Sequence, residues 1–270
     1  MATENYSIAI CKGAALLEET RNLIVDWNIG EPAEEFAERA LSHGIVGSAT
    51  AYRARDIIKR VFIPRFLKPS DKPARILKTV IEQGLSFSVF RELLLLFSAR
   101  KDLLIYDFII DGYWTAANRG KHSLDVEFVL SFISAAVAEN KIEKPWSEQV
   151  SRKVSRGLLG LLTEVGFLRA RQRGQREIID YRISDLSLVL IARELHDAGF
   201  HNSALAQHPD WRLFGLKTND VLNRLELLNE DYGLLLQRAG SVIAINWGVA
   251  SIEELIGLIS KNRKLSCRTY

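Results

Sequence analysis

Residues 146–184 read WSEQVSRKVSRGLLGLLTEVGFLRARQRGQREIIDYRIS, and this stretch decides the fold. Ser147 is a preferred helix N-cap residue, and the acidic Glu148 in the first turn suits the helix dipole. Apolar residues then recur at helical spacing from Val150 to Val165. Gly166 follows as a natural helix terminator. The stretch therefore begins with an amphipathic helix.

A short basic hairpin follows this helix. We expect a first strand over Phe167–Arg171, a turn centred on Gly174, and a returning strand over Ile179–Ile183. Alternation places Leu168 on the apolar face and the neighbouring arginines on the opposite face. A helix followed by a basic hairpin is typical of a winged helix, which commonly presents its helix to a DNA major groove and its wing to the adjacent backbone.

Composition predicts a soluble, globular, cytoplasmic protein. The chain has 270 residues, of which 47% are hydrophobic and 26% are charged. No apolar run approaches the roughly 18 residues that a membrane span needs, so we expect no membrane partner. With only Cys11 and Cys267 present, a disulfide framework is implausible, and a reducing compartment fits best.

The net charge of +3 hides a segregated distribution. Residues 52–78 carry a net charge of +7 and residues 150–182 carry +5, whereas residues 1–51 carry −5. Two basic blocks in an otherwise mildly acidic chain are typical of a polyanion-binding protein. The alternative is that these blocks pair with the acidic ones within the fold.

The N-terminal basic block lies in a helix-turn-helix arrangement. We expect one helix over Pro32–Leu41 and a second, capped by Ser48, through about Phe66. On the second helix Arg53, Lys59 and Arg60 fall off the apolar stripe, as residues of a recognition helix do. The alternative is a plain helical hairpin with solvated basic side chains.

The whole chain is predicted to be mainly α, a multi-helical fold with helix-turn-helix or winged-helix elements and two small β-hairpins. Four regions are expected: an N-terminal helix-turn-helix-like region (1–72), a helical middle region (73–145), a winged-helix-like domain (146–215) and a C-terminal helix-hairpin-helix region (216–270). Further helices are expected over 13–27, 74–83, 86–99, 102–118, 124–139, 186–197, 218–228 and 251–260.

In the C-terminal region, Thr218 is expected to cap a helix. A second hairpin, Leu234–Trp247, is apolar and suits packing or partner binding. Ser251 and Glu254 form a capping box for the last helix. The tail from Lys261 onwards is expected to be loose and cationic.

Catalytic patterns are weak throughout the chain. There is no Gly-rich phosphate loop. The cluster around His196, His201 and His208 matches no zinc spacing, and Asp107 and Asp111 lack a third nearby carboxylate. We therefore expect no catalytic residues, no metal, no cofactor and no small-molecule substrate.

The basic helix near the N-terminus, the segment Tyr106–Ile110 and above all the run from Trp146 to Leu168 resemble the BrxA family of bacterial BREX phage-defence systems. This resemblance covers about the first 230 residues and implies a mostly helical, non-enzymatic protein. It further implies binding to double-stranded DNA and assistance to a multi-protein restriction and methylation system. The family was formerly described as an inner-membrane protein, and no segment of this chain supports that description.

Two functions from different classes follow. The first is a DNA-binding accessory protein with double-stranded DNA and other phage-defence components as partners. Its candidate nucleic-acid-binding residues are Arg152, Lys153, Arg156, Arg169, Arg171, Arg173 and Arg176, with Arg53, Lys59 and Arg60. The i,i+4 pair of Arg152 and Arg156 repels in an isolated helix, which makes sense if phosphates neutralise it. The second is a protein-interaction adaptor without direct DNA binding, using the acidic N-terminal face and the second hairpin.

Overall fold

The computed structural model describes residues 5–11, 17–47, 50–229, 232–240 and 242–266. The side chains of residues 173 and 263–266 lie outside this description. The chain forms two units, and each unit joins two separated stretches of sequence. Unit 1 comprises Met1–Arg75 and Leu94–Tyr181, and unit 2 comprises Ile76–Leu93 and Arg182–Tyr270. The four consecutive regions expected from sequence are a different division, and their boundaries stay a prediction.

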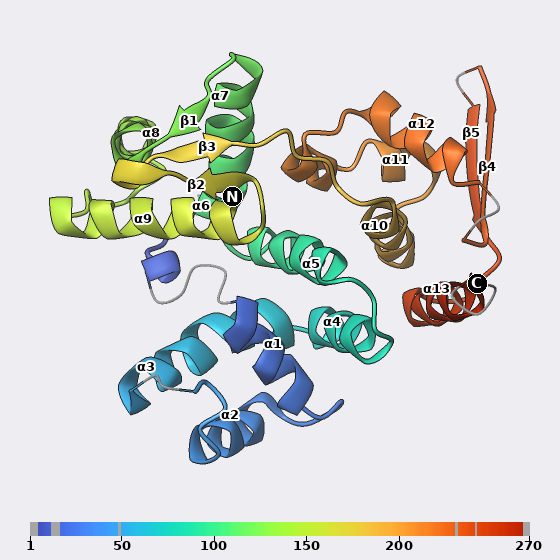
Figure 1. The fold of residues 1–270 in the computed structure, drawn as a ribbon, viewed down its shortest axis with the longest axis horizontal. Coiled ribbons are helices and arrows are strands. Elements are labelled where there is room, and N and C mark those ends of the chain that lie inside the picture. Colours follow the sequence, from blue (N-terminus) through green and yellow to red (C-terminus); the bar gives the residue numbers. More distant parts are fainter. Residues whose placement is uncertain (1–4, 12–16, 48–49, 230–231, 241, 267–270) are drawn as a thin grey trace. The chain divides into compact units, whose positions relative to one another are not determined.

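Helices dominate both units, so the prediction of a mainly α fold is confirmed (Figure 1). In unit 1 the helical segments are η1 (Ala9–Cys11), α1 (Leu17–Asp26), α2 (Ala33–Ser42), α3 (Ala51–Asp56), the π-helical η2 (Ile57–Leu67), α6 (Leu103–Asp107), the π-helical η3 (Phe108–Trp114), α7 (Thr115–Asn118), α8 (Val126–Ala138), α9 (Glu148–Glu164) and the 3-10 turn η4 (Gln172–Gly174). Two helices, α4 (Lys72–Glu82) and α5 (Phe87–Ala99), contribute residues to both units.

A small antiparallel sheet lies beside α9 in unit 1. Its strands are β1 (Ser123–Leu124), β2 (Leu168–Ala170) and β3 (Arg176–Ile178), in the order β1-β3-β2. Along β2 and β3 the residue Leu168 pairs with Ile178, Arg169 with Glu177, and Ala170 with Arg176. Each strand of the hairpin β2–η4–β3 therefore contributes three paired residues.

The prediction of a returning strand over Ile179–Ile183 is wrong. The strand begins three residues earlier, because Arg176 and Glu177 pair with β2 although their side chains are charged. The alternating apolar residues of the sequence begin only at Ile179, so the pattern predicted a strand that begins too late. The strand β1 was not predicted, since two residues give no period-2 pattern to detect.

The N-terminal helices of unit 1 pack around aromatic rings. Phe62 lies 5.5 Å, centroid to centroid, from both Phe36 and Phe66. The Thr50 hydroxyl accepts from the backbone N–H of Arg53 and so caps α3. The predicted cap, Ser48, lies outside the described residues, as does the start expected for the first helix.

Unit 2 combines short helices with a two-stranded hairpin. Its further elements are α10 (Asp185–Asp197), α11 (Asn202–Ala206), the 3-10 helix η5 (Pro209–Phe214), α12 (Thr218–Leu227), β4 (Leu234–Ala239), β5 (Val242–Trp247) and α13 (Ile252–Ser266). Helix α10 is the centre of this unit. Its buried Arg193 donates to the carbonyl oxygens of Val249 (3.0 Å) and Ala250 (2.7 Å), which fixes the approach to α13.

Several C-terminal predictions are confirmed and others are wrong. The second hairpin lies where expected, and the Ser251 hydroxyl caps the last helix by accepting from Glu254 N–H at 3.2 Å. The tail expected to be loose from Lys261 is helical as far as Ser266, because α13 continues. Thr218 is the first helical residue and not the cap; instead the Asp220 carboxylate accepts from the backbone N–H of Lys217.

Candidate nucleic-acid interface

Helix α9 is fixed at both ends by local hydrogen bonds. At its start the Ser147 hydroxyl accepts from Val150 N–H at 3.3 Å, as the sequence predicts. At its end Gly166 adopts a φ of 91°, and Phe167 N–H reaches back to the Leu162 carbonyl at 2.8 Å. Because the apolar stripe of α9 is buried, the polar face that begins near Arg152 is turned outwards.

The cations of this outward face differ in their neighbours. Arg152 donates to Glu148 (2.9 Å) and to Glu127 of α8 (3.0 Å), and these hydrogen bonds raise the pKa of its guanidinium. The predicted repulsion between Arg152 and Arg156 is therefore offset within the protein itself. Lys153 and Arg156 are exposed and form no ion pair with any described side chain. They are the two cations of α9 that are left for an external anion.

The hairpin after α9 concentrates positive charge around a single carboxylate. Arg171 donates to Glu177 from Nε at 2.9 Å, and a terminal guanidinium nitrogen lies 2.6 Å from the same oxygen. Arg169 lies 3.7 Å from that oxygen, directly across the strand pair. Arg176 donates to the Gln175 carbonyl, whereas the side chain of Arg173 lies outside the described residues. Between Leu168 and Ile178 the net charge is +3.

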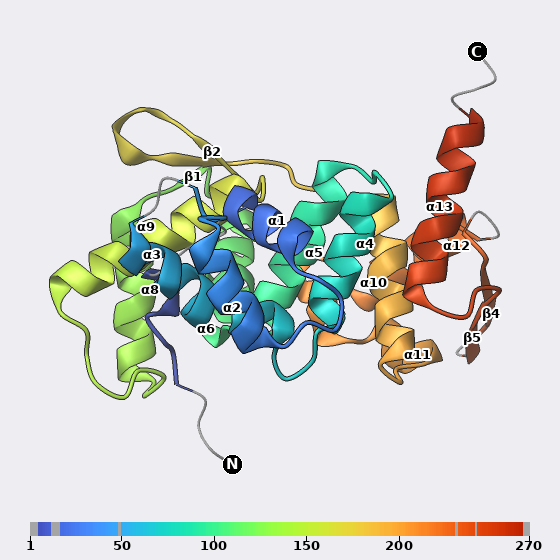
Figure 2. The ribbon, with the colours of Figure 1, turned by 90° about the horizontal axis from the view of Figure 1, so that it is seen from below.

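An aromatic cluster anchors the base of this hairpin. The Tyr113 hydroxyl of η3 donates to the Phe167 carbonyl at 3.1 Å, and the two rings stack 5.1 Å apart. Tyr181 lies against the same Phe167 ring at 4.2 Å. Burial raises the pKa of Tyr113, so its hydroxyl keeps its proton and remains a donor. These contacts fix the base of the hairpin, and Figure 2 shows the hairpin projecting from that base.

The basic residues of the N-terminal helices are partly neutralised. Lys59 lies 3.7 Å from Glu34 of α2, and Arg60 lies 3.2 Å from Asp56. Arg53 is exposed and forms no ion pair with a described side chain. These contacts favour the plain helical hairpin over a recognition helix at this place.

The other candidate polar residues contact partners within the protein. The Nδ1 atoms of His196 and His201 lie 3.1 Å apart in unit 2, and Asp107 accepts from the Tyr6 hydroxyl at 2.7 Å. Within the described part of the chain, no three His, Cys, Asp or Glu side chains gather closely enough to hold a metal ion. Among those residues there is also no helix with the length and apolar character to cross a membrane.

Two carboxylates that lie against the basic residues of this candidate site, Glu177 and Glu127, were not predicted from sequence. Glu177 lies opposite Arg169 only because β3 begins at Arg176, and Glu127 reaches Arg152 from a different helix. The charge pattern Arg-x-x-x-Glu at 173–177 does not indicate how the two strands of the hairpin pair. Only a correct assignment of β3 would have placed Glu177 beside Arg169. The sequence contains no signal that places Glu127 beside Arg152.

The fold and this surface define a class: a helical protein with a small sheet whose arginine-rich hairpin follows an amphipathic helix. The family model of BrxA matches residues 4–194, so the chain belongs to the BrxA family. This membership points to a component of a BREX phage-defence system. A crystal structure of an uncharacterized protein from Magnetospirillum magneticum is similar, with a TM-score of 0.59 at 13% identity, covering 78% of this chain and 98% of that chain. No curated protein matches the sequence.

Proposed function

We propose that this protein is a non-enzymatic accessory component of a BREX-like defence system that binds duplex DNA through α9 and the β2–η4–β3 hairpin. The observation that carries the proposal is the hairpin itself. It holds four arginines and one glutamate within eleven residues and follows directly on a helix with two externally available cations.

The order of elements supports this proposal. From η3–α7 the chain continues through β1, α8, α9, β2 and β3, and the sheet order is β1-β3-β2. Winged helices have this order of helices and strands. In that fold the helix before the hairpin enters a major groove and the hairpin follows the phosphate backbone, so α9 and the hairpin would take these two roles.

Charge supports backbone contact more strongly than base readout. Each arginine that neutralises a phosphate releases condensed counterions, and log K then falls with log salt by about 0.9 per contact. Arg169 and Arg171 both lie beside Glu177, so two of the hairpin's positive charges are close together on one side of the strand pair. Phosphate oxygens are acceptors that a guanidinium binds in the same geometry as a carboxylate.

The test is a salt series of fluorescence-anisotropy titrations on a random duplex. Arg171→Ala with Arg173→Ala is expected to weaken binding to all sequences alike and to flatten the salt slope by up to about 1.8. Lys101→Ala with Lys217→Ala removes the same charge at exposed positions outside both elements and serves as the matched control. An unchanged slope in a folded hairpin variant would remove the hairpin from the DNA.

We also propose that the chain has no catalytic role. Asp107 is engaged by Tyr6 and by Lys141 at 3.3 Å, which leaves it poorly suited to hold a catalytic cation. Incubation of plasmid DNA with the protein and magnesium, manganese or zinc is expected to give no cleavage. Cleavage that disappears in Asp107→Asn would contradict this.

A second candidate function, a protein-interaction adaptor, is favoured by one feature of unit 2. The β4–β5 hairpin exposes apolar side chains, with Leu235 41% and Val242 67% exposed. It also lies beyond residue 194, where the family match ends. Absence of duplex binding in the titration above would favour this second function.

A further inference from the structure

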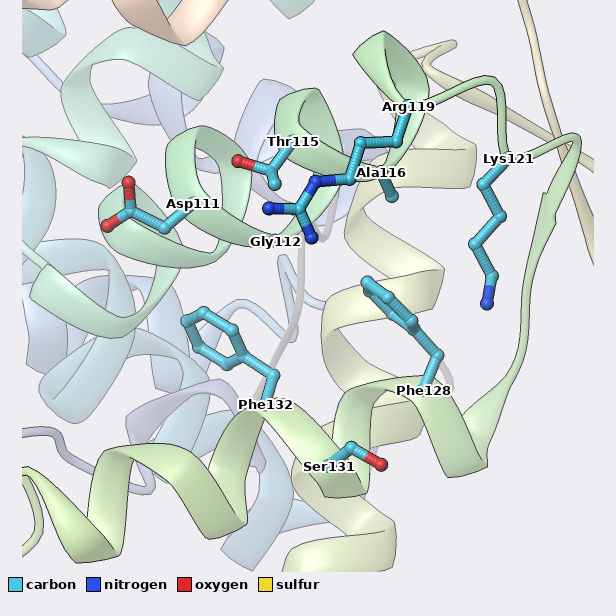
Figure 3. Close-up of a pocket in the computed structure, with 9 residues that line it drawn as sticks. All are labelled: Asp111, Gly112, Thr115, Ala116, Arg119, Lys121, Phe128, Ser131 and Phe132. Carbon is cyan, nitrogen blue, oxygen red and sulfur yellow. The ribbon is translucent and has the colours of Figure 1, made fainter.

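A second site with mixed chemistry lies in unit 1 and shares no residue with the proposed DNA-binding face. It is a pocket of about 360 Å³ between η3–α7 and α8 (Figure 3). Its lining combines two aromatic rings, two cations, a carboxylate, two hydroxyls and two small residues: Phe128, Phe132, Arg119, Lys121, Asp111, Thr115, Ser131, Gly112 and Ala116.

The aromatic side of the pocket is held in place by its neighbours. Phe132 meets the buried Phe108 edge-on at 5.2 Å and stacks with Tyr6 at 6.4 Å. Opposite these rings, Gly112 and Ala116 are the small residues of the wall, which leaves space beside the rings. At Gly112 even a Cβ atom would lie 2.7 Å from the Phe108 ring, so this position cannot carry a side chain without moving that ring.

The cationic side of the pocket lacks an anion. The Lys121 ammonium lies 4.8 Å from the centroid of the Phe128 ring, a cation–π contact that partly substitutes for a negative partner. Figure 3 shows the Arg119 side chain pointing from the opposite wall toward the space between the two rings. Neither cation forms an ion pair with any described side chain. Asp111 lies at the end of the pocket opposite Lys121.

We propose that this pocket binds a nucleoside monophosphate, either as a free nucleotide or as an unpaired nucleotide of a nucleic acid strand. The base stacks on the phenylalanine rings, and the phosphate accepts from Arg119 and Lys121. An amino group on the base donates to Asp111. The volume suits a ligand at the small end of the range for such sites. This proposal does not depend on duplex binding by α9 and the hairpin.

Calorimetric titration of the full chain tests the free form of the ligand. Deoxyadenosine monophosphate is expected to bind, and 2-deoxyribose 5-phosphate, which lacks the base, is expected to bind at least about fivefold more weakly. Phe128→Leu and Arg119→Ala should each weaken nucleotide binding by at least about fivefold. Arg119 is exposed at the end of α7, so its variant folds even if Phe128→Leu does not. Arg156→Ala on α9 is the matched control and should bind the nucleotide normally.

A second arm tests the strand-borne form. The protein is titrated with a fully paired duplex and with the same duplex containing one unpaired adenosine. Preference for the unpaired nucleotide that is lost in Arg119→Ala assigns the pocket to a strand, whereas Arg119-dependent binding of the monophosphate alone assigns it to a free nucleotide. The proposal is overturned if neither ligand shows Arg119 dependence, or if the base-free sugar phosphate binds equally well. Loss of duplex binding in the hairpin variants leaves both of these results unaffected.

Discussion

Glu177 is the single carboxylate between Leu168 and Ile178, and it reduces the positive charge of the hairpin. It neutralises part of Arg169 and Arg171, so its own charge opposes any phosphate that approaches them. We predict that Glu177→Gln tightens binding to random duplex and steepens the salt slope by up to about 0.9, one additional phosphate contact. The measurement is the same anisotropy series. Glu143→Gln, at an exposed site outside the hairpin, controls for net charge, and weaker binding by Glu177→Gln would argue against the hairpin as a phosphate contact.

His196 makes unit 2 sensitive to acid. Burial, followed by the proximity of His201 and Arg193, lowers the pKa of His196, while Asp197 opposes this shift. The unfolded chain, with a histidine pKa of about 6.5, therefore takes up the proton at a higher pH than the folded chain does. This contribution to stability is complete above about pH 6.5 and is lost as the pH falls below that value.

We predict that His196→Gln makes the free energy of unfolding fall less steeply between about pH 6.5 and 5. Urea unfolding at several pH values measures this slope. His43→Gln removes an exposed histidine from unit 1 and serves as the control. Parallel pH profiles for wild type and His196→Gln would show that His196 does not contribute.

At the scale of elements, α9 depends on its first turn. Ser147→Ala leaves a backbone donor without its side-chain acceptor, and we expect the free energy of unfolding to fall by about 1 kcal/mol. Ser147→Asp keeps an acceptor and adds a charge that suits the helix dipole, so it should retain the stability of the wild type. Urea denaturation of the three proteins compares these values. Equal stability of the Ala variant would mean that the cap is dispensable.

Elements with local signals, including the apolar hairpin β4–β5, were predictable from sequence, whereas the short or charged strands β1 and β3 were not. The cap at Ser147 and the stop at Gly166 depend on hydrogen bonds within a few residues, so the sequence located α9 almost to the residue. The strand β3 depends on its partner β2, and its charged residues gave no alternating pattern. For the site, the positions of the arginines followed from sequence, whereas their partners Glu177 and Glu127 required the tertiary fold.

At the scale of the whole molecule, the interleaved division of the chain governs how it can be shortened. Ile76–Leu93 belongs to unit 2, where the Gln83 carbonyl accepts from Ser260 and the Glu92 carboxylate accepts from Ser184. We predict that a chain truncated after residue 181 associates and binds a hydrophobic dye, because this stretch loses the partners that bury it. Size-exclusion chromatography and dye fluorescence, with the full chain as control, measure this. A monodisperse truncated chain that binds no dye would show that unit 1 tolerates the exposed segment.

The same interleaving imposes an order of events during synthesis. The stretch Ile76–Leu93 leaves the ribosome about ninety residues before its partners from Arg182 onwards. At typical elongation rates it waits for roughly 5 to 20 s with apolar residues such as Ile76 and Leu77 uncovered. Meanwhile Leu94–Tyr181 emerges and joins the N-terminal residues already made. The order of synthesis therefore allows unit 1 to form first, whereas unit 2 cannot be complete before the residues from Arg182 onwards have been made.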